Sequence, residues 1–216
     1  MRGGEITVGN LINAAFNSGF GFRSYKPKIF LIGFNKCGTT SLHKFFHAQG
    51  LKSVHNLLSG QKLAIEVSQC VDVQTCRKTF AHGQVFSDFT SLTDKKFCEP
   101  IDMYPLWRQA FPDAYFILNT RNVDSWLRSR AGHSNGTFLK RYMSLFDQTE
   151  EEVLLQWRSK FLAHTKSVLS FFEEDERFCH FMLGQDDIGK IVTLLAADYR
   201  LEAAMFGNIN SKRTSG

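Results

Sequence analysis

The stretch KIFLIGFNKCGTTSL, residues 28–42, decides the fold. It opens with the apolar, β-rich run KIFLIGF, which is typical of a fully buried parallel strand. After a glycine-containing turn, TTSLHKFFHAQG places Leu42, Phe45 and Phe46 at helical spacing, and Gly50 stands where helices commonly end. The stretch therefore predicts a strand, a loop and a helix in direct succession.

The loop between this strand and this helix has the residue types that bind an anion. Gly33 and Gly38 have the G-x-x-x-x-G spacing of a phosphate loop, but Thr39 stands at the position of the Walker lysine, and Lys36 lies three residues earlier. Such a loop aims backbone N–H groups and the positive end of the helix dipole at a bound oxyanion. We therefore expect Gly38, Thr39 and Thr40 to cradle a phosphate within reach of the Lys36 ammonium. The alternative is a plain strand-to-helix turn.

The alternation of strands and helices continues along the chain. Further strands are predicted at residues 51–54, 84–89, 115–121 and 177–184. Helices are predicted within residues 61–81 and over 102–111, 123–130, 151–172 and 186–198, with Asn122 or Asp124 capping the third of these. This order predicts an α/β fold, a single domain with a doubly wound, mainly parallel sheet flanked by helices.

The two ends of the chain differ from this pattern. Residues 1–25 are rich in Gly, Asn and Ser, so we expect a flexible or loosely packed lead-in, with the α/β domain over residues 26–216. No apolar run approaches the roughly 20 residues of a membrane span, and the N-terminal segment lacks the apolar core of a signal peptide. These features predict a cytoplasmic protein without a membrane span.

The composition narrows the class of protein further. Hydrophobic residues make up 43% and charged residues 22% of the 216 residues, which excludes wholesale disorder and a fibrous repeat. The net charge of +5 favours anionic ligands without requiring a nucleic acid, and no nucleic-acid-binding motif is present. The five cysteines form no CxxC pair and are expected to be reduced thiols.

Two stretches in this order carry a resemblance to a known family. KIFLIGFNKCGTTSL resembles the 5′-phosphosulfate loop of the sulfotransferases, a P-loop-like superfamily in which a strand is followed by Lys-x-Gly-Thr-Thr. YFILNTRNVDSWLRSR resembles the 3′-phosphate motif of the same family, in which a strand ends in Arg and a Ser follows eight residues later; Arg121 and Ser129 have this spacing. The resemblance covers residues 28–130. The tail FGNINSKR is only loosely similar to the C-terminal segment of the family.

The resemblance implies a P-loop NTPase-like sulfotransferase fold and transfer of a sulfuryl group from 3′-phosphoadenosine 5′-phosphosulfate (PAPS), with 3′-phosphoadenosine 5′-phosphate (PAP) as product and no metal. Arg121 and Ser129 would select the 3′-phosphate, with Arg128 and Arg130 widening the positive field. The 5′-phosphosulfate would be bound by Lys36, Cys37, Gly38, Thr39, Thr40 and Ser41, and Lys36 would also serve the leaving group in catalysis.

The base that takes the proton of the acceptor is less clear from the sequence. In the family this base is a His or a carboxylate at a neighbouring strand end, and the candidates here are Asp88 in VFSDFTS and His55 after LKSV. Asp88 is the favoured catalytic base. The alternatives are a capping or turn role for Asp88 and a loop histidine without function for His55.

Two other constellations need weighing. His43 and His47 are one helical turn apart, but no third metal ligand follows at a recognisable spacing. Cys37 lies at a helix N-terminus, where a thiolate is favoured, so a nucleophilic role is a further alternative to the use of its backbone alone.

The acceptor would be a hydroxyl or amine of a carbohydrate, lipid or small metabolite, held by small lids or by a pocket that a homodimer completes. The 21 phenylalanines offer either core packing or an apolar acceptor pocket. Two rival functions stay open at this point. One is a P-loop kinase or NTPase, and the other is a non-catalytic nucleotide-binding protein of the same fold.

Overall fold

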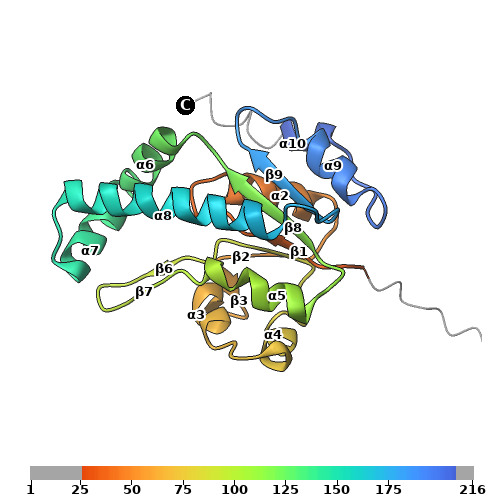
Figure 1. Ribbon diagram of the computed structural model, residues 1–216, viewed down its shortest axis with the longest axis horizontal. Helices are drawn as coiled ribbons and strands as arrows, with labels where there is room; N and C mark the ends of the chain where they lie inside the picture. Colours follow the sequence, from red (N-terminus) through yellow and green to blue (C-terminus); the bar gives the residue numbers. More distant parts are fainter. Residues whose placement is uncertain (1–25, 208–216) are drawn as a thin grey trace, which may run out of the picture.

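A parallel sheet of five strands forms the centre of the computed structural model, which describes residues 26–207 (Figure 1). Its strand order is β2-β5-β1-β8-β9, and every neighbouring pair is parallel. The bounds are β1 (Ile29–Leu31), β2 (Ser53–His55), β5 (Val85–Ser87), β8 (Tyr115–Thr120) and β9 (Phe178–Met182). The predicted lead-in over residues 1–25 and the tail after residue 207 lie outside the described residues.

Strand β1 is central because both of its faces are apolar. Ile29 and Leu31 pack into one buried cluster, and Phe30 and Ile32 pack into the other, as the alternation of side chains along a strand requires. After β1 the chain builds one half of the sheet, and after β5 it crosses to the other half. The carboxyl end of β1 is therefore the topological switch point, where doubly wound folds form their ligand crevice.

Helices cover both faces of the sheet (Figure 1). One face carries α2 (Thr39–Ala48), α9 (Gly189–Leu195) and α10 (Ala204–Gly207). The other carries α3 (Leu63–Ser68), α4 (Val73–Thr79), α5 (Tyr104–Ala110), α6 (Val123–Ala131), α7 (Thr137–Phe146) and α8 (Glu150–Phe171). The α/β single-domain fold expected from the sequence, with its doubly wound parallel sheet, is thereby confirmed.

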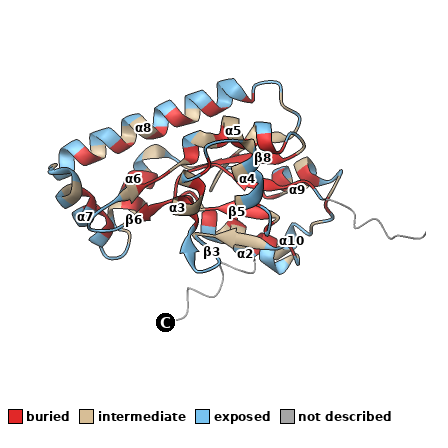
Figure 2. Cartoon of the chain, turned by 90° about the horizontal axis from the view of Figure 1, so that it is seen from below, coloured by how far each residue is buried: buried red, intermediate tan, exposed pale blue. Residues whose placement is uncertain are grey.

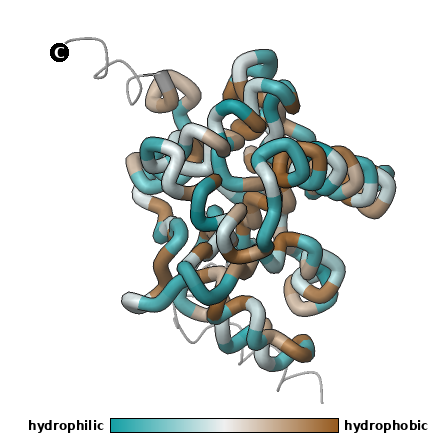
Figure 3. Tube along the Cα trace, turned by 90° about the vertical axis from the view of Figure 1, so that its left-hand side faces the viewer, coloured by the Kyte–Doolittle hydropathy of each residue, from teal (hydrophilic) through white to brown (hydrophobic). Residues whose placement is uncertain are grey.

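The long helix α8 shows how sequence sets a boundary and a face. Its N-terminus is a capping box, in which Thr149 Oγ1 accepts from the Glu152 N–H and Glu152 Oε2 accepts from the Thr149 N–H, at 3.3 and 2.8 Å. Val153, Trp157 and Phe161 fall on its buried side, as predicted. Its buried positions are red in Figure 2, and Figure 3 shows hydrophobic and hydrophilic bands alternating along the helices.

Several short elements differ from the sequence prediction. Helix α7 was not predicted, although Phe138, Leu139 and Tyr142 are buried at helical spacing after Gly136. A 3₁₀ turn over Ile101–Met103 precedes α5, so the helix expected over 102–111 begins later, at Tyr104. Two small hairpins were also missed, β3 (Leu57–Leu58) with β4 (Gln61–Lys62) and β6 (Ser91–Leu92) with β7 (Phe97–Cys98). Strands of two residues leave no readable alternation in a sequence.

A buried ion pair joins α6 to the segment that follows β7. Arg130 Nη2 lies 2.8 Å from Glu99 Oε1, and each side chain is 1% exposed. The Arg130 guanidinium also lies over four aromatic rings at 4.8–5.6 Å, those of Phe34, Trp126, Phe138 and Trp157. The expectation that Arg130 adds to a positive field for the nucleotide is therefore wrong, because its charge is neutralised inside the core.

Removal of this arginine should destabilise the fold strongly. In Arg130→Ala the Glu99 carboxylate keeps Lys160 and Thr90 but loses its buried cation. We expect a loss of about 3–5 kcal/mol in the free energy of unfolding, the usual effect of leaving a buried charge without its partner. Urea denaturation followed by circular dichroism measures it. The matched control is Arg158→Ala, which breaks the exposed pair with Asp124 and should cost no more than about 1 kcal/mol. Equal losses for the two variants would contradict the role given to Arg130.

Candidate active site

The loops that follow the parallel strands meet at one edge of the sheet, and this edge gathers the residues singled out from the sequence. The loop over residues 33–38 follows β1, Asp88 follows β5, and Arg121 follows β8. His55 is the last residue of β2. Since β2, β5, β1 and β8 are consecutive in the sheet, these residues belong to neighbouring strand ends.

The loop after β1 is clamped by Asn119, a fully buried residue of β8. The Asn119 side chain accepts from the Gly33 N–H at 3.0 Å and donates to the Cys37 carbonyl at 3.0 Å. Glycine is required at position 33, because a Cβ there would lie 1.8 Å from the Asn119 carbonyl oxygen. One amide side chain therefore holds both ends of the loop.

Three other side chains hold carbonyl groups of the same loop region. His164 Nε2 lies 2.8 Å from the Ile32 oxygen, Trp126 Nε1 donates to the Asn35 oxygen at 2.9 Å, and Arg121 Nη1 donates to the Lys36 oxygen at 3.3 Å. His164 is oriented in turn by Asp102, whose pKa this hydrogen bond lowers. These contacts fix the backbone of the loop, in which the N–H groups of Gly33 and Cys37 are also engaged, with Asn119 Oδ1 and the Phe34 oxygen.

Helix α2 begins where this loop ends. Gly38 is its N-cap residue with φ of +82°, a conformation that favours glycine. The first helical bond runs from Leu42 N to Gly38 O, so the N–H groups of Thr39, Thr40 and Ser41 precede the intrahelical ladder. Together with the helix dipole, these N–H groups form the arrangement that binds phosphate.

Lys36 lies inside the loop with φ of +66° and is half-buried. Its Nζ is 3.5 Å from His133 Nδ1. Burial lowers the pKa of His133, and the nearby charge of Lys36 adds to this effect, so the ring is neutral near pH 7 and can accept from the ammonium. His133 therefore orients the only lysine of the loop.

Left-handed backbone recurs at this edge. Lys36, Asn56 and Asp88 all have positive φ, at 66°, 62° and 60°, and each follows one of the strands β1, β2 and β5. This conformation is sterically unfavourable for non-glycine residues, and residues that adopt it concentrate at functional sites.

Asp88 and His55, the two candidate bases, lie close together. His55 Nε2 is 3.8 Å from Asp88 Oδ2 and 3.3 Å from Thr40 Oγ1, and His55 Nδ1 is 2.9 Å from Ser87 Oγ. Burial lowers the pKa of His55 to about 4, whereas burial and the Glu99 charge raise the pKa of Asp88 to about 6. At neutral pH the imidazole is uncharged and the carboxylate is ionised but poorly solvated, which makes Asp88 the stronger proton acceptor.

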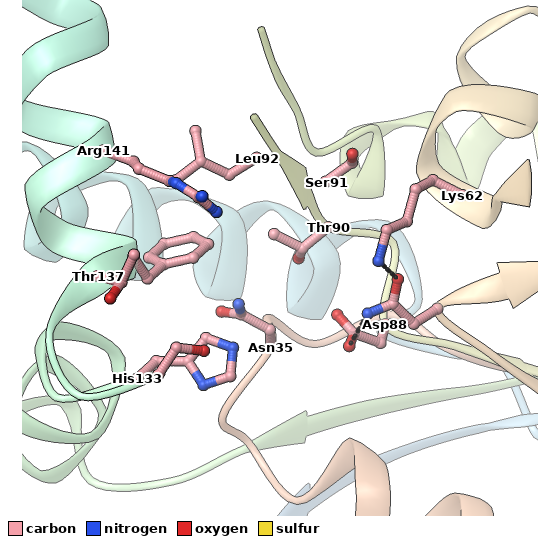
Figure 4. Close-up of a pocket in the computed structure, with 12 residues that line it drawn as sticks. Asn35, Lys62, Asp88, Thr90, Ser91, Leu92, His133, Thr137 and Arg141 are labelled. Atoms are coloured by element: carbon pink, nitrogen blue, oxygen red, sulfur yellow. Dashed lines mark hydrogen bonds between the residues drawn. The ribbon is translucent and has the colours of Figure 1, made fainter. Parts of the chain in front are cut away.

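A cavity of about 150 Å³ opens beside Asp88 (Figure 4). Its inner wall includes Asn35 and Asp88, and two buried oxygens, Asn35 Oδ1 and Asp88 Oδ1, have no hydrogen-bond partner within residues 26–207. His133 also lines the cavity, so Lys36 is one hydrogen bond away from it. Buried acceptors without donors indicate a ligand that carries N–H or O–H groups.

The remaining residues singled out from the sequence take different places. Thr39 is buried and Thr40 is exposed at the start of α2, and Ser41 is half-buried beside them. Ser129 is half-buried in α6, the helix whose Trp126 contacts the loop, but no contact joins Ser129 to Arg121. Asn122, not Asp124, caps α6, by accepting from the Ser125 N–H at 3.1 Å.

Cys37 and the histidine pair do not have the surroundings that a nucleophile or a metal site needs. The Cys37 thiol is fully buried, and burial raises its pKa to about 12, which disfavours a thiolate. His43 and His47 stack at 6.0 Å, and His43 Nδ1 lies 2.8 Å from Ser53 Oγ. Within residues 26–207, no group of three His, Cys, Asp or Glu side chains could hold a metal ion.

The five cysteines are free and buried. Across the described part of the chain, helices fall short of the length or apolarity that crossing a membrane requires.

Several residues of this edge were missed in the sequence. Asn119, His164 and Trp126 looked like ordinary strand or helix positions, and their contacts with the loop span 82 to 132 residues. His133 follows α6 without a motif. A polar Asn inside the apolar run YFILNTR was the one available signal, since a buried amide needs partners.

Two comparisons found similarity to known proteins. A solved structure described as a sulfotransferase from Alicyclobacillus acidocaldarius aligns with 15% identity and a TM-score of 0.45, covering 83% of this chain and 85% of that one. No curated protein matches this chain. The family model described as a sulfotransferase domain matches residues 28–190, from the start of β1 into α9. The chain therefore belongs to the sulfotransferase domain family.

Proposed function

We propose that this protein transfers a sulfuryl group from PAPS to a hydroxyl or amine acceptor without a metal. One observation carries the proposal: the clamped loop, through Asn35, and the buried carboxylate of Asp88 border the same cavity, which His133 connects to Lys36. Family membership supports the reaction class. The kinase or NTPase alternative has less support, because Thr39 occupies the Walker lysine position.

The donor site would be formed by the loop and by the start of α6. The backbone N–H groups of Gly38, Thr39, Thr40 and Ser41 would bind the 5′-phosphosulfate, whereas the Cys37 N–H donates to the Phe34 carbonyl at 3.3 Å. The planar guanidinium of Arg121, which already contacts the loop at the Lys36 carbonyl, would bind the 3′-phosphate together with Ser129. These residues fit a ligand with two anionic ends.

The chain's own groups would then serve the transfer step. When bound, PAPS supplies a sulfuryl group attached to a phosphate leaving group. The acceptor oxygen or nitrogen forms a bond to sulfur as the bond from sulfur to the bridging oxygen breaks, and that electron pair stays on the 5′-phosphate of PAP. Lys36 neutralises the charge that develops on this oxygen. Asp88 takes the acceptor proton, and Asn56, which donates to Asp88 Oδ2 at 3.4 Å, holds the carboxylate in place.

The Arg121 assignment can be tested by calorimetric titration with PAP and with ADP in EDTA. We expect micromolar PAP binding that weakens roughly tenfold to hundredfold in Arg121→Ala, because a charge-assisted contact contributes about 1.5–3 kcal/mol. ADP lacks the 3′-phosphate and should be affected little.

The matched control is Arg128→Ala, an exposed arginine of α6, the helix that follows Arg121, whose contact is with Ser125. An equal loss for ADP would show that Arg121 acts through the loop instead. A preference for ATP with Mg²⁺ would favour the kinase alternative, and PAP binding without any turnover would favour a non-catalytic nucleotide-binding protein.

The identity of the base can be read from the pH profile of kcat/KM, measured as PAP release. A base is active when deprotonated, so with Asp88, whose pKa is raised to about 6, the rate should rise with pH through about 6. If His55 were the base, the rise would lie near pH 4. Asp88→Asn should lower the rate by roughly 10²–10⁴-fold. Unchanged PAP affinity in this variant shows that it is folded, and a wild-type rate in it would exclude Asp88 as the base.

A further inference from the structure

The cavity beside Asp88 is polar, and this bears on the acceptor. Its apolar lining comes from Leu92 and Phe138 alone, whereas the remaining residues carry amide, hydroxyl, imidazole, carboxylate or cationic groups. The abundant phenylalanines lie elsewhere, for example in the stack of Phe30, Phe86 and Phe116 under the sheet. These rings therefore do not form the apolar acceptor pocket that the sequence left open as an alternative.

Two cations stand on the rim of this cavity. Lys62 reaches in from β4 and Arg141 from α7, on opposite sides above Asn35 and Asp88 (Figure 4). The Lys62 ammonium donates to Asn56 Oδ1 at 2.8 Å and forms no direct ion pair within the described residues, although its charge acts on Asp88 and opposes the rise in the pKa of that carboxyl. Arg141 pairs with Asp94 through Nε at 2.9 Å, and both of these side chains are largely exposed.

The charges of the cavity are separated in space. The two cations, Lys62 and Arg141, lie on the rim, whereas Asp88 lies at the inner wall and Asp94 pairs with Arg141 outside the cavity. The pKa of Asp88 is raised to about 6, so its carboxylate is ionised at neutral pH and repels an anion from the inner wall. A cationic rim above an anionic inner wall orients an anion toward the rim.

We propose that the acceptor is a small polar compound with a hydroxyl or amine at one end and an anionic group at the other, a carboxylate or phosphate, held between Lys62 and Arg141. The donor end satisfies Asn35 Oδ1 and Asp88 Oδ1, the two buried oxygens without partners. The anionic end stays at the rim, where a charge keeps its contact with water. This inference rests on the proposed function, because only a transferase has an acceptor. The binding of such a compound in the cavity can be measured independently of that function.

Matched pairs of probes test the charge requirement by calorimetry at constant ionic strength, on the full chain saturated with PAP. The pairs are D-glucuronate against D-glucose, and glycerol 3-phosphate against glycerol. We expect the anionic member of at least one pair to bind tenfold or more tightly than the neutral member. Equal binding in both pairs, or tighter binding of the neutral members, would overturn the proposal.

Variants of the rim residues test where the anionic group of the probe binds. The double variant Lys62→Gln, Arg141→Gln changes two exposed side chains and should remove the preference, whereas Lys140→Gln, an exposed neighbour of Arg141 in α7, should keep it. A preference that survives the double variant would place the anion elsewhere and refute the assignment. An anionic probe that competes with PAP would bind at the donor loop, and this too would refute it.

The two proposals fail separately. If PAP does not bind, the donor assignment fails, and the same probe pairs titrated without PAP still decide the anion preference. If PAP binds and neither anionic probe is preferred, the donor assignment stands and the acceptor assignment fails.

Discussion

The site depends on the capture of the loop's carbonyl groups by side chains from other elements. Asn119, Trp126, Arg121 and His164 together engage four of the six carbonyls from Ile32 to Cys37. A backbone held in this way keeps the N–H groups at the start of α2 in a fixed position, so they need no rearrangement when an anion arrives. The Asn119 clamp is possible only because Gly33 lacks a side chain, so a substitution at Gly33 would displace Asn119 as well.

The position of this loop follows from the sheet topology. The clamp comes from β8, the neighbour of β1, and the proposed base, Asp88, comes from the end of β5, the neighbour on the other side. A doubly wound sheet parts its connections at β1, which opens the space between these strand ends. Left-handed backbone at Lys36, Asn56 and Asp88 then turns the chain sharply after three strands. The packing of the buried core beneath the sheet stabilises these strained positions.

The sequence predicted the main strands and most helices because each has a strong local pattern. Buried parallel strands are continuous apolar runs, and helices such as α8 carry a cap and one apolar face. The candidate phosphate loop was recognisable because the residues expected to bind an anion are adjacent in the sequence. Arg130 was misread, because only its distance to Glu99 and its four aromatic neighbours distinguish a core arginine from a surface one. The clamp at Asn119 and the cavity around Asn35 likewise join segments far apart in sequence.

The cavity has two polar ends that local sequence could not reveal. Its inner oxygens need hydrogen-bond donors, and its rim carries the cations Lys62 and Arg141. A neutral polyol would supply donors to the oxygens but no anion to the cations, and an anion without a hydroxyl or amine would do the reverse. Only a compound with both groups satisfies the two ends at once, and in that orientation its donor end lies against Asp88, while His133, which contacts Lys36, lines the same cavity. The charge pattern that selects the acceptor would therefore also orient its nucleophilic end toward the groups that serve the transfer.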